Sequence, residues 1–406
     1  MKVHILQHGL KDFHSHYYNE TLEYVRALQW QHIDYEVYVH QACEPDIVNE
    51  LGAHPIFRYA TDLILDTDPL VSELAGFIYF STGFAEDLQE HLTDHIASDD
   101  VIIVPYCTQN EVYGLSRWLK LLNGLTMPNI AVFVHRPEFG WALSEDRKEI
   151  QANASFWRLA VIELDRTLGD VKKPIYLCSN SMLARVMQKI TGIPWINAGL
   201  VTASARKKKP TGVFKDIDVA FIGEFRPEKG SQIILDAFVK IDRQWPHLRY
   251  FIQTKNNRLT AEQFLKKHGF SGVVEFIEGD LTESQYFHHL WRCRLLVLPY
   301  VASRYALRAS GVMSEAISFA IPVVVPANTW LADQVTGGVA AGRVFEAFTG
   351  ESVAKATASA IHSLRALESD ARVLAGSWNE KNNADSILKK ILSAVSGMKS
   401  DTGSAR

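Results

Sequence analysis

The feature that most constrains the fold is a repeated pairing of a short β-branched run with a longer segment of helical spacing. The pairing recurs along the whole 406-residue chain. Such alternation is typical of parallel sheets covered by helices on both faces. It predicts an α/β protein with two doubly wound, Rossmann-like domains. The predicted strands are 3–6, 35–39, 101–104, 130–134 and 175–177 in the first half, and 219–222, 250–252, 273–277, 295–298 and 323–325 in the second.

A polar segment separates the two sets of strands. Residues 203–216 are rich in lysine and broken by proline and glycine, so they cannot bury an apolar face and are interpreted as a linker. Because ligands bind beyond the carboxyl ends of parallel strands, we expect the site in a cleft between the domains. The predicted boundaries are 1–202 for the N-terminal domain, 217–375 for the C-terminal domain, 376–396 for a helix that crosses back to the N-terminal domain, and 397–406 for a flexible tail.

Charge and cysteine content exclude several classes of protein. Lys and Arg number 42 against 46 Asp and Glu, a formal charge of −4, so bulk nucleic-acid binding is not expected. No apolar run approaches the roughly 18 residues of a spanning helix. We expect a cytoplasmic protein, with peripheral contact on the inner face of a membrane as an open alternative through the basic and aromatic stretch 116–122, which otherwise faces the core. The cysteines form no CxxC pair and are expected to be reduced: Cys43, Cys107, Cys178 and Cys293.

The first informative motif follows the predicted strand 219–222. The strand ends at Gly223, and a basic loop leads through Gly230 into a helix. A glycine allows close backbone approach, and a helix N-terminus favours an anion. Arg226 and Lys229 are therefore candidate phosphate partners. The alternative is an exposed charged loop in which Gly230 only helps the helix to start.

The second motif follows the predicted strand 295–298. Ser310 and Gly311 stand where a strand-to-helix turn should cap the next helix, so the amides from Ser310 to Val312 are candidate anion donors.

Glu315 lies about one turn further along that helix, among apolar neighbours. A carboxylate in such a setting can accept two hydroxyl groups of a sugar. It can equally form an ion pair with Arg304 or Arg308, and both interpretations stay open at this point.

The loop after the first predicted strand is hinged at Gly9 and rich in groups that bond to or stack on sugars, among them His14 and His16. We interpret it as an acceptor or donor-sugar loop. A metal site built from His8, Asp12, His14 and His16 would lack a diagnostic ligand spacing, so no metal is predicted. The two DxD patterns, 66–68 and 216–218, are short enough to arise by chance.

Together the two motifs resemble the donor-binding half of retaining GT-B glycosyltransferases of family 4. The likeness is strongest over residues 217–335, and in the N-terminal half Gly9, Tyr106 and His135 resemble the family layout. Three positions differ: Glu224 replaces the usual arginine, Leu307 stands where a first glutamate is expected, and Ala320 replaces a glycine. The matching residues are Gly223, Lys229 and Gly230 in the first motif and Glu315, Ala316, Pro322, Val323 and Val324 in the second.

The resemblance implies a metal-independent, retaining transferase that moves a sugar from a nucleotide diphosphate-sugar to a hydroxyl acceptor on a glycan, a lipid-linked carrier or a small molecule. The N-terminal domain would bind the acceptor and the C-terminal domain the donor, without a cofactor. The implied catalytic residues are His135, Lys229 and Arg226. The implied donor-binding residues are Gly223, Arg226, Lys229, Ser310, Gly311, Val312 and Glu315, and the acceptor-binding residues are Gly9, His14, His16 and Tyr106.

Two other functions stay open. A non-catalytic GT-B binding or chaperone subunit would explain Glu224 and Leu307. An epimerase acting on the nucleotide sugar itself would need carboxylates placed to act on the sugar, and no convincing pair is visible in the sequence.

Overall fold

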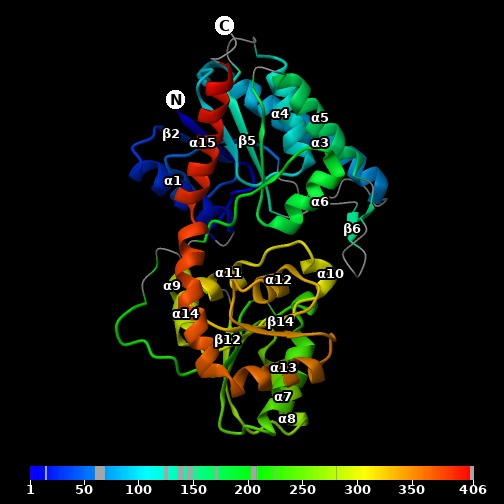
Figure 1. The fold of residues 1–406 in the computed structure, drawn as a ribbon, viewed down its shortest axis with the longest axis vertical. Helices are drawn as coiled ribbons and strands as arrows, with labels where there is room; N and C mark the ends of the chain where they lie inside the picture. Colours follow the sequence, from blue (N-terminus) through cyan, green and yellow to red (C-terminus); the bar gives the residue numbers. More distant parts are fainter. Residues whose placement is uncertain are drawn as a thin grey trace. The chain divides into compact units, whose positions relative to one another are not determined.

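The fold was analysed in a computed structural model, which describes residues 1–13, 16–59, 69–122, 127–135, 141–143, 150–152, 154–169, 172–202, 207, 209–223, 225–279 and 281–402. The chain divides into two compact units. Unit 1 contains Met1–Ala142, Ile150–Val201 and Asn382–Arg406, and unit 2 contains Thr202–Lys381. After Lys381 the chain therefore returns to unit 1 at its C-terminal end (Figure 1).

Unit 1 is built on a seven-stranded sheet in the order β3-β2-β1-β4-β5-β8-β9. Every pairing in this sheet is parallel. The strands are β1 (Val3–Gln7), β2 (Tyr35–His40), β3 (His54–Phe57), β4 (Val101–Val104), β5 (Asn129–Val134), β8 (Ile175–Cys178) and β9 (Ile196–Asn197), and β6 (Trp141–Leu143) pairs with β7 (Ile150–Ala152). The helices are α1 (His16–Trp30), α2 (Pro45–Leu51), α3 (Pro69–His91), η1 (Thr93–His95), α4 (Gln109–Leu119), α5 (Ser155–Leu168), α6 (Ser181–Thr191) and α15 (Ala384–Thr402).

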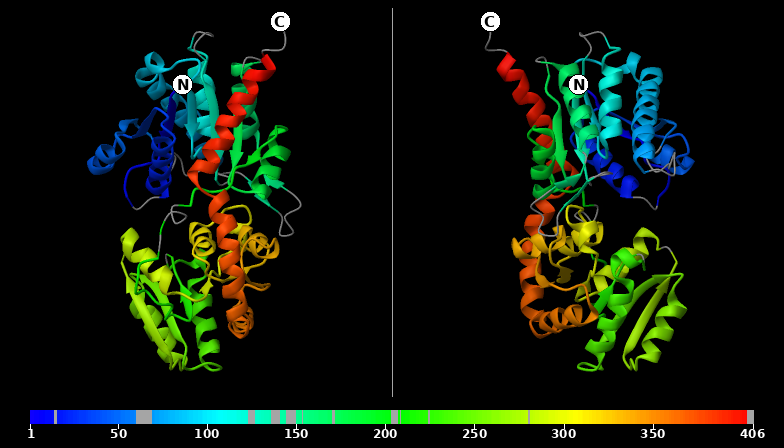
Figure 2. Two further views of the ribbon diagram at one scale, coloured as in Figure 1. Left: turned by 60° about the vertical axis from the view of Figure 1, so that its left-hand side comes forward. Right: turned by 90° about the vertical axis from the view of Figure 1, so that its right-hand side faces the viewer.

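The alternation of side chains along β1 explains the two covered faces of this sheet. Val3 and Ile5 point into a core shared with α1 and α15, in which Leu28 and Leu388 are fully buried. Helices α3, α4 and α5 lie side by side as the other helical layer (Figures 1 and 2). Unit 1 is thus a three-layer α/β domain.

Unit 2 repeats the architecture with a six-stranded sheet in the order β12-β11-β10-β13-β14-β15, again with parallel pairings. The strands are β10 (Val219–Phe221), β11 (Arg249–Lys255), β12 (Val273–Glu278), β13 (Leu296–Val297), β14 (Val323–Pro326) and β15 (Gly342–Phe345). The helices are η4 (Pro227–Lys229), α7 (Ser231–Asp242), α8 (Arg258–Lys267), α9 (Glu283–Arg292), α10 (Ala302–Tyr305), α11 (Gly311–Ser318), α12 (Trp330–Thr336), α13 (Gly350–His362) and α14 (Leu364–Lys381).

The order of the strands reverses once in each sheet. In unit 1 the reversal lies between β1 and β4, and in unit 2 between β10 and β13. The loops that leave two such strands diverge, which opens a crevice at their carboxyl ends. The prediction of two doubly wound, Rossmann-like domains is confirmed, and each domain carries one such switch point.

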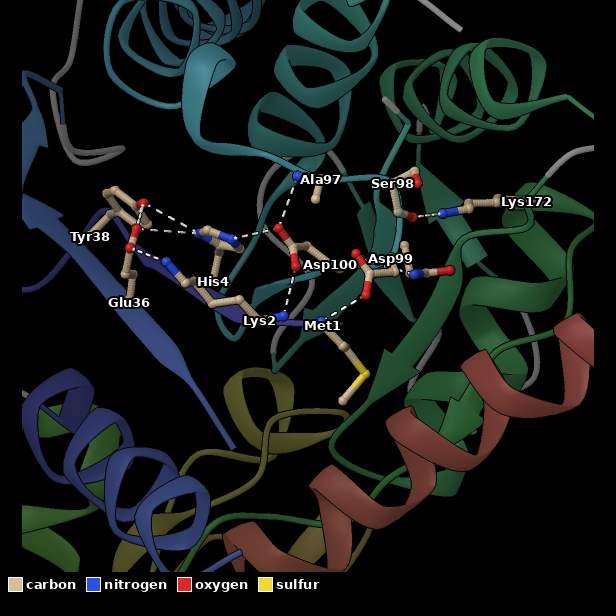
Figure 3. A network of polar contacts seen from close by, with 11 residues as sticks. Met1, Lys2, His4, Glu36, Tyr38, Ala97, Ser98, Asp99, Asp100 and Lys172 are labelled. Atoms are coloured by element: carbon tan, nitrogen blue, oxygen red, sulfur yellow. Dashed lines mark hydrogen bonds and ion pairs between the residues drawn. The ribbon is translucent and has the colours of Figure 1, made fainter. Parts of the chain in front are cut away.

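A polar network joins central strands of the sheet in unit 1. His4 is fully buried; its Nδ1 lies 3.3 Å from the Tyr38 hydroxyl and its Nε2 lies 3.4 Å from Asp100 Oδ2. Asp100 also accepts hydrogen bonds from the backbone amides of Lys2 and Ala97 (Figure 3). Burial is the main cause that lowers the pKa of His4. The network ties β1, β2 and the segment before β4 together, away from the switch point.

The C-terminal helix differs from its prediction. A single helix over 376–396 was expected, but α14 ends at Lys381 and α15 begins at Ala384. Asn383 causes the break, because its side-chain oxygen accepts a hydrogen bond from the Ser386 amide at 2.8 Å and so caps the second helix. α15 continues through Thr402 and so occupies part of the predicted tail 397–406, and residues 403–406 lie outside the described part.

We predict that α15 is an integral part of unit 1. Leu388→Ala should lower the free energy of unfolding by about 2–5 kcal/mol, because it leaves a cavity in a core where Leu388 is fully buried. The matched control is Val373→Ala on α14, where the side chain is 75% exposed and the change should stay within about 0.5 kcal/mol. Urea denaturation followed by circular dichroism measures both. Equal effects of the two substitutions would contradict the docking of α15.

Candidate functional site

The switch point of unit 2 brings together the two motifs found in the sequence. One loop follows β10 and the other follows β13, on the two sides of the strand reversal. The backbone amide of Val301 donates to the carbonyl oxygen of Glu228 at 2.9 Å, which ties the two loops together. Glu228 and Val301, 73 positions apart in the chain, therefore lie on one surface of unit 2.

Lys229 lies over the turn that ends β10. Gly223 has φ +124°, and a methyl carbon placed on it would lie 3.1 Å from the Lys229 amine. The same amine lies 5.6 Å from the centre of the Tyr300 ring. The Gly223 amide is held by Gln253 on β11, at 2.9 Å from Oε1. The cation and the turn are thus placed side by side, as a phosphate-binding loop requires.

Gly230 permits the close contact between the two loops. Its φ is +78°, and a methyl carbon there would lie 2.1 Å from the carbonyl oxygen of Pro299. It also serves as the N-cap of α7. The glycine therefore does more than start a helix, because any side chain would push the loop after β10 off the loop after β13.

Arg226 is less enclosed than Lys229. Its side chain is 55% exposed, and Nη1 lies 3.7 Å from Glu228 Oε1. Glu224, where the resembling family has arginine, lies outside the described residues. Arg226 is placed on the same loop as Lys229 and faces solvent, where it can reach an anionic ligand.

The N-terminus of α11 has the expected capping geometry. Ser310 is the N-cap, and its hydroxyl accepts a hydrogen bond from the Met313 amide at 3.3 Å. A methyl carbon on Gly311 would meet nothing within 4 Å, so the helix start is open. The amides of Gly311 and Val312 belong to the first turn, whose N–H groups have no partner within a helix.

Glu315 takes its hydrogen bond from a residue that sequence reasoning missed. The hydroxyl of Tyr286 on α9 donates to Glu315 Oε2. Burial raises the pKa of Glu315 to about 7, while the Tyr286 hydrogen bond and the charge of Lys229 act in the opposite direction. The ion pair with Arg304 or Arg308, the alternative interpretation of Glu315, is wrong for the described residues, since Tyr286 is the partner. The carboxylate is held close to Lys229 with a protonation equilibrium near neutral pH.

Leu307 is 4% exposed and contributes to the apolar interior. Arg308 beside it lies over the Tyr305 ring at 5.7 Å, and Tyr305 lies 4.5 Å from the Tyr300 ring. The position where the resembling family carries a glutamate is therefore held by a buried leucine here.

The switch point of unit 1 gathers most of its predicted residues into an aromatic cluster. A methyl carbon on Gly9 would lie 3.0 Å from the Tyr17 ring. The Tyr17 ring meets Tyr106 edge-on at 4.9 Å, and Tyr106 stacks on His135 at 5.1 Å. His16 lies 5.2 Å from the Tyr106 ring. Gly9, His16, Tyr106 and His135 are thus brought together, whereas His14 lies outside the described residues.

His135 has one ring nitrogen committed to the protein. Its Nε2 lies 2.8 Å from the carbonyl oxygen of Pro105, and a carbonyl can only accept, so Nε2 carries the proton. Glu20 on α1 lies 3.3 Å from the same nitrogen. With Nε2 committed in this way, Nδ1 is the ring nitrogen that can face a ligand.

A polar cluster near the carboxyl ends of β1 and β4 was not predicted. His8 Nε2 lies 3.4 Å from Glu111 Oε1, and Glu111 forms a capping box with Thr108 at the start of α4. Gln7 and Asn110 are buried with side-chain atoms that find no hydrogen-bond partner among the described residues. The signal that could have found them is polar residues near the carboxyl ends of β1 and β4: Gln7 is the last residue of β1, and Asn110 is in the first turn of α4, which follows β4.

Metal and membrane features were also sought in the described part of the chain. It contains no group of three or more His, Cys, Asp or Glu side chains placed to hold a metal ion. Asp216 accepts two hydrogen bonds from Arg292, so the second DxD pattern has a structural use, and the first lies outside the described residues. No described helix is both long and apolar enough to span a bilayer. In stretch 116–122, Trp118 is fully buried and donates to Thr93, as a core-facing helix requires.

Solved structures match the chain over almost its full length. HepE from Anabaena, crystallised with UDP, matches with a TM-score of 0.64 and 14% identity over 98% of this chain and 100% of that chain. The pneumococcal O-GlcNAc transferase GtfA, in complex with UDP and GlcNAc, gives 0.64 and 11% over 98% and 99%. The chain has the GT-B fold.

The GT-B fold is shared by proteins with different chemistry. A putative UDP-N-acetylglucosamine 2-epimerase from Listeria monocytogenes matches with a TM-score of 0.60 and 13% identity over 98% of this chain and 97% of that chain. No protein-family model and no curated protein sequence matches the chain. At these identities the comparisons show the fold alone, and the function has to be argued from the site.

We predict that Gly230 is required for the joined loops. Alanine with a positive φ costs roughly 1–2 kcal/mol, so Gly230→Ala and Gly212→Ala, with φ of +78° and +87°, share that cost. A methyl carbon at Gly212 meets nothing within 4 Å, so only Gly230→Ala adds a clash. The clash should lower the free energy of unfolding of Gly230→Ala by about 1–3 kcal/mol more than that of Gly212→Ala. Urea denaturation measures the difference, and equal losses would show that the close approach is absent in solution.

Proposed function

We propose that the chain is a glycosyltransferase that moves a sugar from a nucleotide diphosphate-sugar to a hydroxyl acceptor, with retention of configuration and without a metal. The observation that carries the proposal is the placement of Lys229 beside Gly223 at the switch point of unit 2, in the unit where α11 also begins with an open first turn. Cations and helix amides at such a point are suited to a diphosphate. The fold shared with structures crystallised with UDP and UDP-glucose supports this use.

In this proposal the donor is held by its diphosphate and its ribose. Lys229 and Arg226 neutralise the charge that develops on the β-phosphate as the sugar leaves, and the amides from Ser310 to Val312 add dipoles aimed at the same group. Glu315 accepts hydrogen bonds from the ribose hydroxyls. Such stabilisation takes the role that a divalent metal has in other transferases, so no cofactor is needed.

Unit 1 supplies the acceptor side of the proposal. Gly9, His16 and Tyr106 would contact the acceptor, as would His14, which lies outside the described residues, and His135 would offer Nδ1 to a sugar hydroxyl. The acceptor is a glycan, a lipid-linked sugar or a small molecule. Contact with a membrane surface would use Arg117, Lys120 and Leu121, which are exposed at the end of α4, because Trp118 is buried.

One specific observation favours an epimerase as the second candidate function. The similarity to the Listeria putative epimerase extends over 98% of this chain. Incubation with a UDP-sugar and no acceptor separates the two, because an epimerase converts the sugar while a transferase leaves it unchanged or slowly hydrolyses it. A non-catalytic subunit, which the buried Leu307 favours, would release no nucleotide diphosphate in any assay.

The first experiment is a thermal-shift screen with UDP-, GDP-, ADP- and dTDP-sugars. A ligand that binds only the native state raises the melting temperature. The sugar nucleotide that produces the largest shift then serves as donor in a nucleotide-release assay with a panel of acceptors. Absence of any shift with all four classes would remove the proposal.

We predict that Lys229→Ala lowers the turnover number by about 10²- to 10³-fold, as expected when one electrostatic donor to a leaving group is lost. Arg226→Ala should have a smaller effect, because its side chain is 55% exposed and lies near Glu228. Lys267→Ala, an exposed lysine at the end of α8, is the matched control and should leave turnover unchanged. Circular dichroism checks the fold of each variant. Full activity of Lys229→Ala would refute the phosphate assignment.

A further inference from the structure

Two helices of unit 2 meet at a polar contact next to the proposed nucleotide site. Tyr286 is in the first turns of α9, and its hydroxyl donates to Glu315 on α11. Figure 1 shows the two helices close together in unit 2. Sequence reasoning gave Tyr286 no role, and the contact takes one of the two carboxylate oxygens of Glu315, Oε2.

The position of Tyr286 is fixed by the local structure of α9. Thr282 and Gln285 form a capping box that sets the first turn of the helix. The next residue, Phe287, meets the ring of Phe319 at the end of α11 edge-on at 5.4 Å. The two helices are therefore held at two points, one polar and one aromatic, and the Tyr286 hydroxyl has little freedom to leave Glu315.

The surroundings of Glu315 contain charges of both signs. The charge of Glu283 on α9 raises the pKa of Glu315, and the charge of Lys229 on η4 lowers it. The amine of Lys229 lies 5.6 Å from the ring of Tyr300, which is buried. Glu283 is itself paired with Lys207 at 2.5 Å. Of these groups Tyr286 makes the direct hydrogen bond to the carboxylate.

We propose that Tyr286 is a positioning residue of the nucleotide site: its hydroxyl holds one oxygen of the Glu315 carboxylate and thereby presents the other oxygen to the ribose hydroxyls of the donor. The inference rests on the proposed function and adds to it a residue and a pH response. A carboxylate with one oxygen anchored keeps its orientation when the site is empty, so less freedom is lost on binding.

The contact also links binding to protonation. Burial raises the pKa of Glu315 to about 7, and the hydrogen bond from Tyr286 lowers it. Above that pH the carboxylate is ionised and accepts the ribose hydroxyls; below it the group is protonated and accepts less well. Donor affinity should therefore fall as the pH drops through about 7. Loss of the Tyr286 hydroxyl should raise the pKa of Glu315 and move the midpoint of binding to higher pH.

The experiment measures binding of UDP-glucose to the full chain by calorimetry between about pH 5.5 and 8.5, a window that spans the protonation of a carboxyl near neutrality. A diphosphate diester does not titrate in this window, so the pH response belongs to the protein. Tyr286→Phe should weaken binding about 5- to 10-fold at pH 7.5, as expected when one typical intramolecular hydrogen bond is lost. Its binding midpoint should lie at higher pH than that of the unaltered chain. A merely structural role of Tyr286 would weaken binding at every pH and leave the midpoint in place.

Two comparisons sharpen the test. Tyr250→Phe is the matched control, because it removes a buried hydroxyl of unit 2 that has no hydrogen-bond partner among the described residues, and it should leave the pH profile unchanged. UDP-glucose that lacks the ribose 2′-hydroxyl should show a smaller difference between the unaltered chain and Tyr286→Phe. Glu315→Gln should bind UDP-glucose weakly with no pH midpoint near neutrality, and it gives the answer if Tyr286→Phe fails to fold.

The outcomes separate this inference from the proposed function. Normal binding by Tyr286→Phe with an unchanged midpoint, or a midpoint that persists in Glu315→Gln, would overturn the positioning role while the transferase proposal stands. If UDP-glucose and the GDP-, ADP- and dTDP-sugars all fail to bind the unaltered chain, the proposed function falls and the inference falls with it.

Discussion

The close approach of Gly230 to the carbonyl oxygen of Pro299 is the constraint on which the second switch point depends. Loops that leave β10 and β13 diverge by topology, and they form one surface only if their backbones touch. A residue without a side chain makes this contact possible, and the hydrogen bond from Val301 to Glu228 extends it. Lys229 precedes Gly230, so the same contact places its amine over the Tyr300 ring.

The candidate site of unit 2 was predictable to the extent that its signals are local. Gly223, Lys229 and Ser310 each follow a β-branched strand and precede a helix, and both the strand order and the capping geometry agree with that pattern. Tyr286 had no such signal, because it lies 29 residues before Glu315 and meets it only through the packing of two helices. The interpretation of Glu315 as a partner of Arg304 or Arg308 failed for the same reason, since spacing along the chain said nothing about α9.

Unit 1 shows a different limit of sequence reasoning. Strand-end residues such as Gly9 and His135 were found, but the use of each ring nitrogen of His135 depends on the carbonyl of Pro105, 30 residues away. Buried polar side chains such as Gln7 and Asn110 carry no motif beyond their place near the carboxyl ends of β1 and β4, and only the structure shows that some of their side-chain atoms have no partner among the described residues. The break between α14 and α15 was missed because the asparagine cap at Asn383 interrupts an otherwise continuous apolar pattern.

The burial of Leu307 explains why a leucine is better suited to this position than the glutamate of the resembling family. A carboxylate at a position that is 4% exposed would have to be desolvated or protonated, at a cost of several kcal/mol unless it were paired. A leucine is buried here instead, and close to it in the chain the Tyr300 and Tyr305 rings lie 4.5 Å apart at a tilted angle, with Arg308 over the Tyr305 ring. The aromatic pair in turn supports Lys229. Within the proposed function, the buried Leu307 therefore brings no negative charge that would oppose the binding of a diphosphate by Lys229.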